Sequence, residues 1–312
     1  MKYNLSNIKK AKKILDKHDC VAIPTETVYG LAANAYSDKA VKKIFKLKRR
    51  PKNNPLIVHY YSLMELKKDC EIGVNFQKLY NKFSPGPITY ILRLKKNSKI
   101  SKKVTNKKET LAVRFPKHKV ARKLLKLLDY PLAAPSANIS TKISAVNSKH
   151  VEEDFGNKIK FILDGGNSVI GLESTIVSLV DRPKILRLGG LSNSEIKKVL
   201  KKNLRLELNP LQTSSPGQMK IHYSPGIPIR LNIKKPREDE AYLLLKKNIK
   251  FQKNVYYLSK NGDLKEAARN LYFTLRRIKK DKFKSIAIEK IKNIGLGKTI
   301  NDRLLRASKF NG

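Results

Sequence analysis

Four short segments of this chain combine hydroxyl, amide and basic side chains beside apolar runs. Residues 24–30 (PTETVYG) follow residues 20–23, an apolar run typical of a buried strand. Threonine and tyrosine are also common within strands, so this segment alone does not establish a binding site. The others are residues 48–51 (KRRP) with 54–59 (NPLIVH), 135–138 (PSAN) and 173–177 (ESTIV). Together they suit a polyphosphate and an amino acid better than a packed core.

In this order, the four segments resemble those of the YrdC-like L-threonylcarbamoyladenylate synthases. The resemblance extends from about residue 11 to residue 187 and continues beyond the short, single-domain members. Residues 216–225 (PGQMKIHYSP) resemble the interdomain linker of the two-domain type. Three further segments resemble the C-terminal domain of the two-domain type, namely residues 267–271 (AARNL), 295–297 (GLG) and 300–304 (INDRL). The chain is therefore identified as a member of the two-domain branch.

This resemblance implies a nucleotidyltransferase that makes threonylcarbamoyl-AMP and pyrophosphate from L-threonine, bicarbonate or CO2, and ATP. The product serves threonylcarbamoyl adenosine modification of tRNA through a downstream threonylcarbamoyl transferase complex. A carbamate must attack the α-phosphorus of a triphosphate, so the site has to neutralise charge and align two anions. The resemblance places Mg2+ on the ATP phosphates, and the spacing of the carboxylates predicts no metal site held by the protein.

The resemblance also implies roles for individual residues. Lys48 and Arg50 are the expected catalytic residues because they would contact the ATP phosphates; they lie two apart, on one side of an extended segment. The expected nucleotide-binding residues are Asn54, Thr110, Ser136, Asn138, Ser144, Arg187 and Tyr223. The expected threonine-binding residues are Thr27, His59, Arg114 and Ser174, with the guanidinium fork of Arg114 on the carboxylate.

Two positions depart from the family pattern. The family usually has Lys-Gly-Arg-Pro, whereas this chain has Arg49 in place of the glycine. That change either hinders close backbone approach or adds a second cation to the site. The Pro-Gly that usually follows the equivalent of Arg187 is here Leu188-Gly189-Gly190, which weakens the assignment of Arg187.

Each candidate also has an ordinary structural interpretation. Residues 48–50 could be a solvated helix end, Arg114 a surface salt bridge and His59 a structural histidine. The glycines of residues 164–166 and 295–297 match no phosphate-binding loop and are interpreted as turns. Residues 301–303 are interpreted as a helix cap with a salt bridge.

The apolar periodicity predicts the elements that would position these residues. We expect helices at residues 5–15, 38–47, 76–83, 117–128 and 192–200, and strands at 20–23, 56–59, 88–94, 111–115, 132–134, 161–163, 175–180 and 185–188. Several strands lie too close in sequence for helical crossovers, so the fold class is α/β with a mixed, twisted, YrdC-like sheet.

A second, smaller domain is expected after a linker. Residues 204–229 contain four prolines and two Ser-Pro steps, which interrupt the strand–helix rhythm. Beyond them, strands at 254–258 and 286–288 and helices at 264–278 and 299–308 indicate a small Rossmann-like α/β unit. The predicted organisation is a catalytic domain at 1–203, a linker or lid at 204–229, and a C-terminal domain at 230–312.

Composition sets the remaining limits. No run of 18 apolar residues is present, residues 1–17 lack the apolar stretch of a signal peptide, and two cysteines cannot form a disulfide framework. We therefore expect a cytoplasmic protein with no membrane partner.

The formal charge of +43 fits a polyanion partner. Because the lysines are scattered along both halves, we attribute it to compositional drift, with weak tRNA binding at most.

Two alternative functions follow from these features. A non-catalytic double-stranded RNA or tRNA-binding module would explain the charge, but it leaves Thr27, Ser174 and the linker without a purpose. A hydrogenase-maturation carbamoyltransferase, which is related, would carry zinc-finger-like cysteines, and Cys20 and Cys70 do not supply them.

Overall fold

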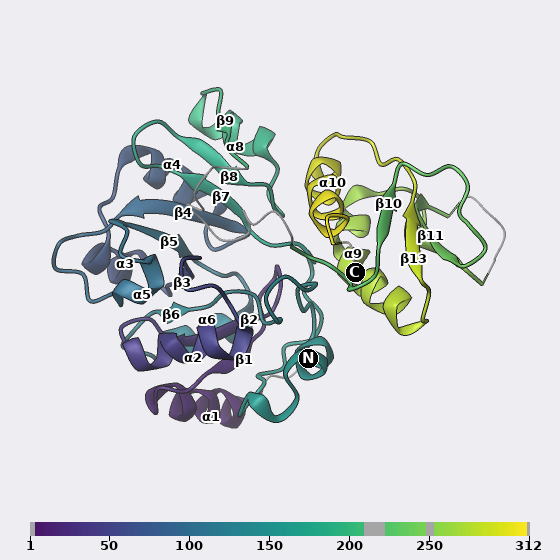
Figure 1. Ribbon diagram of the computed structural model, residues 1–312. Helices are drawn as coiled ribbons and strands as arrows, with labels where there is room; N and C mark the ends of the chain where they lie inside the picture. Colours follow the sequence, from purple (N-terminus) through teal and green to yellow (C-terminus); the bar gives the residue numbers. More distant parts are fainter. Residues whose placement is uncertain (1–3, 209–221, 248–252, 311–312) are drawn as a thin grey trace.

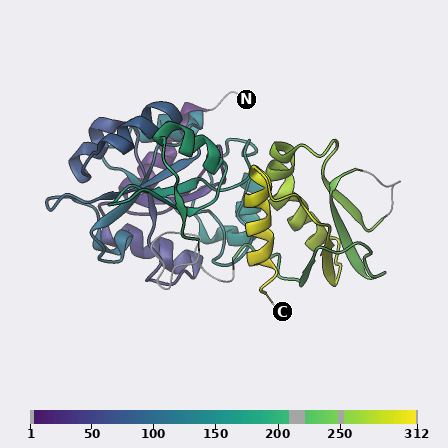
Figure 2. The same ribbon diagram turned by 90° about the horizontal axis from the view of Figure 1, so that it is seen from above.

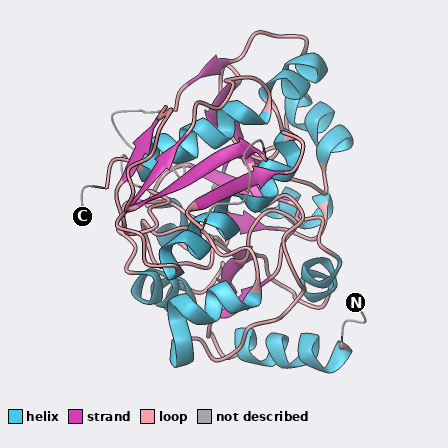
Figure 3. Ribbon diagram, turned by 90° about the vertical axis from the view of Figure 1, so that its right-hand side faces the viewer, coloured by secondary structure: helices cyan, strands magenta, loops and turns pink. Residues whose placement is uncertain are grey.

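The protein is represented by a computed structural model that describes residues 4–208, 222–247 and 253–310. These residues form two α/β units that lie side by side, an N-terminal unit up to residue 208 and a C-terminal unit from residue 229 (Figure 1). Helices flank the strands of the N-terminal unit (Figure 1), whereas the strands of the C-terminal unit form its outer side, which faces the viewer in Figure 3.

Within the described residues, the N-terminal unit holds a nine-stranded sheet in the order β1-β2-β6-β3-β5-β4-β7-β8-β9. The strands are β1 (Val21–Ile23), β2 (Gly30–Asn34), β3 (Ile57–His59), β4 (Ile88–Arg93), β5 (Thr110–Arg114), β6 (Leu132–Ala133), β7 (Thr175–Ser178), β8 (Lys184–Arg187) and β9 (Arg205–Leu206). The pairs β3–β5, β4–β7 and β8–β9 are parallel, and the other five pairs are antiparallel. The predicted mixed sheet is thus confirmed.

The α-helices of the N-terminal unit other than α4 begin at polar side-chain caps, and they bury apolar residues on one face. They are α1 (Leu5–Asp16), α2 (Asp38–Lys48), α3 (Leu63–Asp69), α4 (Val74–Phe83), α5 (Lys102–Thr105), α6 (Lys119–Lys126), α7 (Ser148–Phe155) and α8 (Asn193–Leu200), with a 3-10 turn η1 at Gly156–Lys158. In α1, for example, Asn4 caps the first turn while Ile8, Ala11 and Leu15 are buried at helical spacing.

The C-terminal unit contains a four-stranded parallel sheet in the order β10-β13-β11-β12 within the described residues. Its elements are β10 (Ile229–Leu231), β11 (Glu240–Lys246), β12 (Val255–Ser259), α9 (Leu264–Lys280), β13 (Ser285–Ile288) and α10 (Leu296–Ala307). The predicted small Rossmann-like α/β unit is confirmed by this parallel sheet, in which α9 forms a helical crossover from β12 to β13.

Helices α9 and α10 lie between this second sheet and the N-terminal unit, as Figures 1 and 2 both show. One apolar cluster crosses the boundary. In it Val28, Ile143 and Leu172 of the N-terminal unit share buried contacts with Leu271 and Ile300 of the two helices. The units are therefore joined by a continuous core as well as by the linker.

The segment predicted as a linker is partly inside the sheet. Arg205–Leu206 forms β9, which pairs in parallel with β8, and Leu204 is buried in the main core. Residues 209–221, which include most of the motif at 216–225, lie outside the described residues. Residues 222–225 are described and run along the boundary between the two units.

Three local predictions were wrong. Residues 161–163 form only an isolated bridge to Ala22 instead of a strand. The turn predicted at residues 295–297 was wrong for two of the three residues: Gly295 forms a turn with φ 47°, but Leu296 begins helix α10. The helix predicted from residue 117 starts at Lys119, where the His118 side chain caps the first turn.

Candidate active site

A small cavity lies where β3, β5, β7 and β8 meet the loops after β1 and β6 and the linker residues 222–223. It encloses about 40 Å³, which is room for roughly three water molecules. The described residues that line it are Thr25, Val28, Tyr29, Gly30, Arg50, Ile57, His59, Arg114, Ala134, Pro135, Ser136, Glu173, Ser174, Arg187, His222 and Tyr223. This volume is smaller than that of a nucleoside triphosphate.

One wall presents Arg114, at the end of β5. Its Nη2 atom donates to Glu26 Oε1 at 2.7 Å, and both side chains are buried. Next to it, His59 lines the cavity with its Nδ1 atom lacking any partner among the described residues. Burial and the charge of Arg114 hold the pKa of His59 well below its usual value, so the imidazole is neutral at pH 7.

In the loop after β1, the threonine that lines the cavity is not the one that was predicted. Thr27 is fully buried and its Oγ1 lies 2.8 Å from Thr25 Oγ1. It is Thr25 that lines the cavity, and its hydroxyl donates to the carbonyl of Val28 at 2.6 Å. Thr27 thus stands one layer behind the surface, and Thr25 is a candidate that the sequence did not single out.

The opposite wall is formed by β7 and β8. Ser174 Oγ lies 2.7 Å from Thr89 Oγ1, and the Arg187 Nη2 atom donates to the Ser174 carbonyl at 2.8 Å and to its hydroxyl at 3.1 Å. Position 189 requires glycine for a steric reason: a Cβ there would lie 2.3 Å from the backbone nitrogen of Thr175. The departure from the family pattern therefore leaves Arg187 in place, lining the cavity.

Lys48 and Arg50 do not lie on an extended segment, and that prediction was wrong. Helix α2 continues to Lys48, and Arg49 ends it in the left-handed conformation with φ 51°. Lys48 is buried behind the cavity, where its Nζ donates to the Ser136 carbonyl at 2.6 Å and to that of Asn138. Burial, with Arg50 nearby, holds its pKa well below the usual value. Arg49 points to solvent, so it adds no cation to the site.

Arg50 follows at the cavity wall. Its Nη2 atom donates to Asn54 Oδ1 at 2.6 Å and to the Pro55 carbonyl at 2.9 Å. Burial and the neighbouring Arg187 lower its pKa to about 9, which still leaves the guanidinium protonated at neutral pH. Asn54 thus positions Arg50 from behind the cavity wall.

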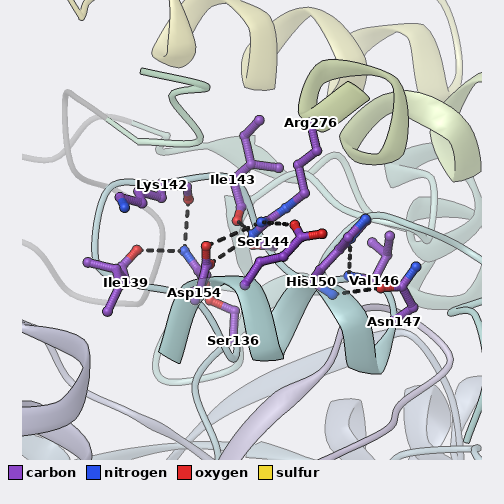
Figure 4. A network of polar contacts seen from close by, with 12 residues as sticks. Ser136, Ile139, Lys142, Ile143, Ser144, Val146, Asn147, His150, Asp154 and Arg276 are labelled. Atoms are coloured by element: carbon purple, nitrogen blue, oxygen red, sulfur yellow. Dashed lines mark hydrogen bonds and ion pairs between the residues drawn. The ribbon is translucent and has the colours of Figure 1, made fainter. Parts of the chain in front are cut away.

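The loop between β6 and α7 carries three of the predicted nucleotide-binding residues and is tied by polar contacts (Figure 4). Ser136 lines the cavity. The Asn138 amide donates to the carbonyls of Ile139 and Lys142, at 2.9 and 2.8 Å, and its Oδ1 lacks a partner among the described residues. Ser144 lies behind Glu173 and donates to its Oε1 at 2.7 Å.

The C-terminal unit holds this same loop in place. Arg276 of α9 donates to the Ile143 carbonyl at 2.7 Å and pairs with Asp154 of α7 at 2.8 Å (Figure 4). His150 of α7 accepts the Val146 N–H through its Nδ1 atom. The loop is therefore positioned by both units.

Thr110 lies apart from the cavity. It begins β5, at the opposite end of that strand from Arg114, and lines a separate open groove of about 760 Å³ with Lys108 and Arg205. A five-residue strand spans roughly 13 Å between its terminal residues. Only a ligand extending along the sheet could contact both residues.

Tyr223 brings the linker into the cavity. Its side chain is 1% exposed, its hydroxyl lacks a partner among the described residues, and its φ of 64° is rare for a bulky residue. His222 lies beside it, with ring centroids 3.9 Å apart. Burial lowers the pKa of His222 to about 3, so this imidazole is also neutral at pH 7.

The described residues contain no cluster of three or more histidine, cysteine, aspartate or glutamate side chains that could hold a metal ion. Across these same segments, no helix combines the length and apolar character that crossing a bilayer requires.

Comparison with known proteins decides the family. Residues 13–189 match the family described as "Telomere recombination" (Sua5, YciO, YrdC), and residues 191–309 match "Threonylcarbamoyl-AMP synthase, C-terminal domain". The threonylcarbamoyl-AMP synthase of Pyrococcus abyssi is 37% identical, over 93% of this chain and 90% of the relative. That of Bacillus subtilis is 34% identical, over 98% and 94%. The chain belongs to the threonylcarbamoyl-AMP synthase family.

The crystal structure of P. abyssi Sua5 complexed with L-threonine has the same two-unit fold. It superposes with a TM-score of 0.91 and 35% identity, covering 99% of this chain and 96% of the other. The family assignment and the predicted two-domain fold are thereby confirmed.

Family membership decides between the predicted functions. The chain is a threonylcarbamoyl-AMP synthase, an ATP-using, nucleotidyltransferase-type enzyme of tRNA processing, as predicted. The non-catalytic RNA-binding module is therefore not its function. Other residues of the cavity wall, or directly behind it, had no such role in the sequence analysis, among them Thr25, Glu26, Glu173, His222 and Arg303. All five lie within motifs that resemble the family, at residues 24–30, 173–177, 216–225 and 300–304, but the resemblance assigned none of them to the site.

Proposed function

We propose that this cavity is where the synthase joins L-threonine, bicarbonate or CO2, and ATP into threonylcarbamoyl-AMP and pyrophosphate. The observation that carries the proposal is the convergence of Arg50, Arg114 and Arg187 on one buried cavity that also presents hydroxyl groups. Buried cations that exceed the nearby carboxylates favour binding of anions. Both reactants, a carbamate and a triphosphate, are anions.

The threonine end is assigned to Arg114, His59, Ser174 and the hydroxyl pair of Thr25 and Thr27. The Arg114 guanidinium would hold the carboxylate in its planar fork, while Glu26 fixes its orientation. Neutral His59 offers an unpartnered Nδ1 atom toward the ligand. The assignment is supported by the similarity of the whole chain to a relative whose crystal structure contains L-threonine.

The nucleotide end is assigned to Arg50, Arg187, Ser136 and Tyr223, with Lys48, Asn54, Asn138 and Ser144 behind them and Thr110 farther along the sheet. Lys48 and Arg50 are the catalytic pair. Arg50 would stabilise the charge that develops on the α-phosphate, and Lys48 would do so after the loop it binds has moved. Their alignment of the carbamate with the phosphorus provides the catalysis without a covalent intermediate.

Mg2+ would enter with ATP. Of the described residues lining the cavity, the carboxylate is Glu173, and its oxygens already accept hydrogen bonds from Ser144, Tyr272 and Arg303. Since Mg2+ is commonly bound through phosphates and water with few protein ligands, the phosphates themselves would carry it. The ion's chemistry is to offset phosphate charge.

The linker would act as a lid. Tyr223 occupies the cavity in a strained backbone conformation, and the enclosed volume is too small for ATP. Opening would admit the nucleotide, and closing would protect the carbamate and the mixed anhydride from water. We place the lid in the part of the predicted linker, residues 204–229, that follows β9, between a catalytic domain predicted at 1–203 and a C-terminal domain predicted at 230–312.

The product is a reactive anhydride that would pass to a threonylcarbamoyl transferase complex acting on tRNA. We place both steps in the cytoplasm, where tRNA and ATP occur together.

The test is the release of pyrophosphate by the purified full chain with ATP and Mg2+. We expect release to require both L-threonine and bicarbonate, and L-serine to react about ten- to a hundredfold less efficiently, because a pocket loses one methyl contact. Product identity is checked by mass spectrometry. Release of pyrophosphate at the same rate without threonine would refute the proposal.

A further inference from the structure

Two side chains of the C-terminal unit reach the wall of the cavity. Arg303 of α10 donates from Nε to Glu173 Oε2 at 2.9 Å, and the Tyr272 hydroxyl of α9 lies 3.1 and 3.0 Å from the two carboxylate oxygens. Arg303 and Tyr272 are 1% and 0% exposed, so neither is a surface salt bridge. The prediction that residues 301–303 cap a helix was wrong, because all three lie in the middle of α10, but the predicted salt bridge is present between Arg303 and Asp302.

Arg303 also contacts the linker. Its guanidinium carbon lies 4.7 Å from the centre of the Tyr223 ring, and Tyr223 stacks on Tyr272 with centroids 5.8 Å apart at 17°. A second donor of Arg303 bonds the Leu188 carbonyl at 2.6 Å, next to Arg187. One arginine therefore contacts three parts of the proposed nucleotide end: Glu173, Tyr223 and the segment after β8.

The electrostatic consequence concerns Glu173. Although burial raises its pKa, Arg303 and Arg187 outweigh that effect and lower it to about 2, so the carboxylate is ionised. An ionised carboxylate on the wall would repel phosphates unless a cation balances it. Arg303 supplies that charge from the side away from the cavity, which leaves Arg50 and Arg187 available for the nucleotide.

We propose that Arg303 is a positioning residue of the synthase: it neutralises Glu173 and fixes Tyr223, so the nucleotide end is complete only when the C-terminal unit is docked. This inference rests on the proposed assignment of that end of the cavity to ATP. The C-terminal unit thus contributes to nucleotide binding without a contact between its own sheet and the ligand.

The experiment compares full-length variants by KM for ATP and KM for threonine. In Arg303→Met the carboxylate loses its cation, and we expect KM for ATP to rise about tenfold or more while KM for threonine changes less than about threefold. In the double variant Arg303→Met with Glu173→Gln no charge is left unpaired, and KM for ATP should return to within about threefold of wild type. Arg303→Lys should fall between them.

The controls separate this effect from general damage. Arg230→Met breaks another Arg–Glu pair of the C-terminal unit, with N–O distances of 2.8 Å to Glu240, far from the cavity. It should leave both KM values unchanged. Thermal midpoints of all variants establish that each is folded at the assay temperature.

Two results would overturn the inference. One is a folded Arg303→Met enzyme with wild-type KM for ATP. The other is a folded double variant that still shows the full rise, which would mean that lost packing and not the carboxylate charge is responsible. If Arg303→Met alone does not fold, the double variant is compared directly with wild type. A KM for ATP raised about tenfold or more in the folded double variant then refutes the proposal. Failure of wild-type enzyme to release threonine-dependent pyrophosphate would instead contradict the proposed function.

Discussion

Neighbouring groups fix the orientation of the Arg114 guanidinium at the cavity. Glu26 holds one of its nitrogens at 2.7 Å, and the Gly86 carbonyl lies 3.4 Å from Nε, so the orientation of the guanidinium plane is set. A planar fork held in this way matches a carboxylate with two parallel hydrogen bonds. A lysine in the same place would be a single point charge.

We therefore expect Arg114→Lys to raise KM for threonine by about tenfold or more and to change KM for ATP far less. Steady-state pyrophosphate assays with each substrate varied in turn provide the measurement. Arg122→Lys is the matched control, because Arg122 contacts Tyr61 outside the cavity. An unchanged KM for threonine would remove Arg114 from the threonine site.

At the scale of the element, the end of α2 explains the family's glycine at position 49. Arg49 has φ 51° and ψ 41°, a left-handed conformation that glycine adopts without steric cost. Its side chain is exposed. The glycine is thus accounted for by how the helix ends, and close approach of the backbone to a ligand is not needed to explain it.

Arg49→Gly should stabilise the protein by about 1 kcal/mol, because a non-glycine residue in this region costs about that much. Urea unfolding, followed by circular dichroism, measures the change. Arg49→Ala keeps a Cβ in the left-handed conformation, so it should give no comparable gain. Equal stability of the glycine and alanine variants would show that φ at this position is not the source of strain.

The whole molecule combines a closed, buried site with a highly basic exterior. The charge of +43 comes from 68 lysines and arginines against 25 acidic residues. Outside the cavity, an open groove is lined by basic residues of the segment that connects β4 to β5, such as Lys95, Lys96, Lys102 and Lys107. Such a surface attracts RNA without reading its sequence.

We expect RNA binding to be unspecific, with affinity falling about a hundredfold or more between 50 and 200 mM salt. Filter binding with cognate tRNA and with an unrelated RNA of equal length provides the comparison. The two RNAs should bind within about threefold of each other. A large preference for the cognate tRNA near physiological salt would indicate a dedicated RNA face.

Much of the fold and of the site could be read from local patterns. Apolar spacing predicted α1, α4, α8 and α9, and the mixed sheet followed from the short gaps between strands. The order of four motifs identified the family, because each combines side-chain types that a packed core does not require. Of the predicted site residues within these four motifs, Arg50, His59, Ser136 and Ser174 line the cavity, as does Tyr223 of the linker motif.

Other features depended on tertiary contacts. Strand β2, Gly30–Asn34, has a weak strand sequence and is held by pairing with β1 and β6. Thr27 and Thr25 are two residues apart, and only packing determines which hydroxyl faces the cavity. Residues 300–304 were marked by their resemblance to the C-terminal domain, but no local pattern could place Arg303 at the site. Its partner Glu173 is 130 residues away and meets it only because α10 docks on the N-terminal unit. Sequence determines the chemistry each segment can offer, whereas docking of the two units determines which groups share a buried site, because burial and charge pairing arise between distant segments.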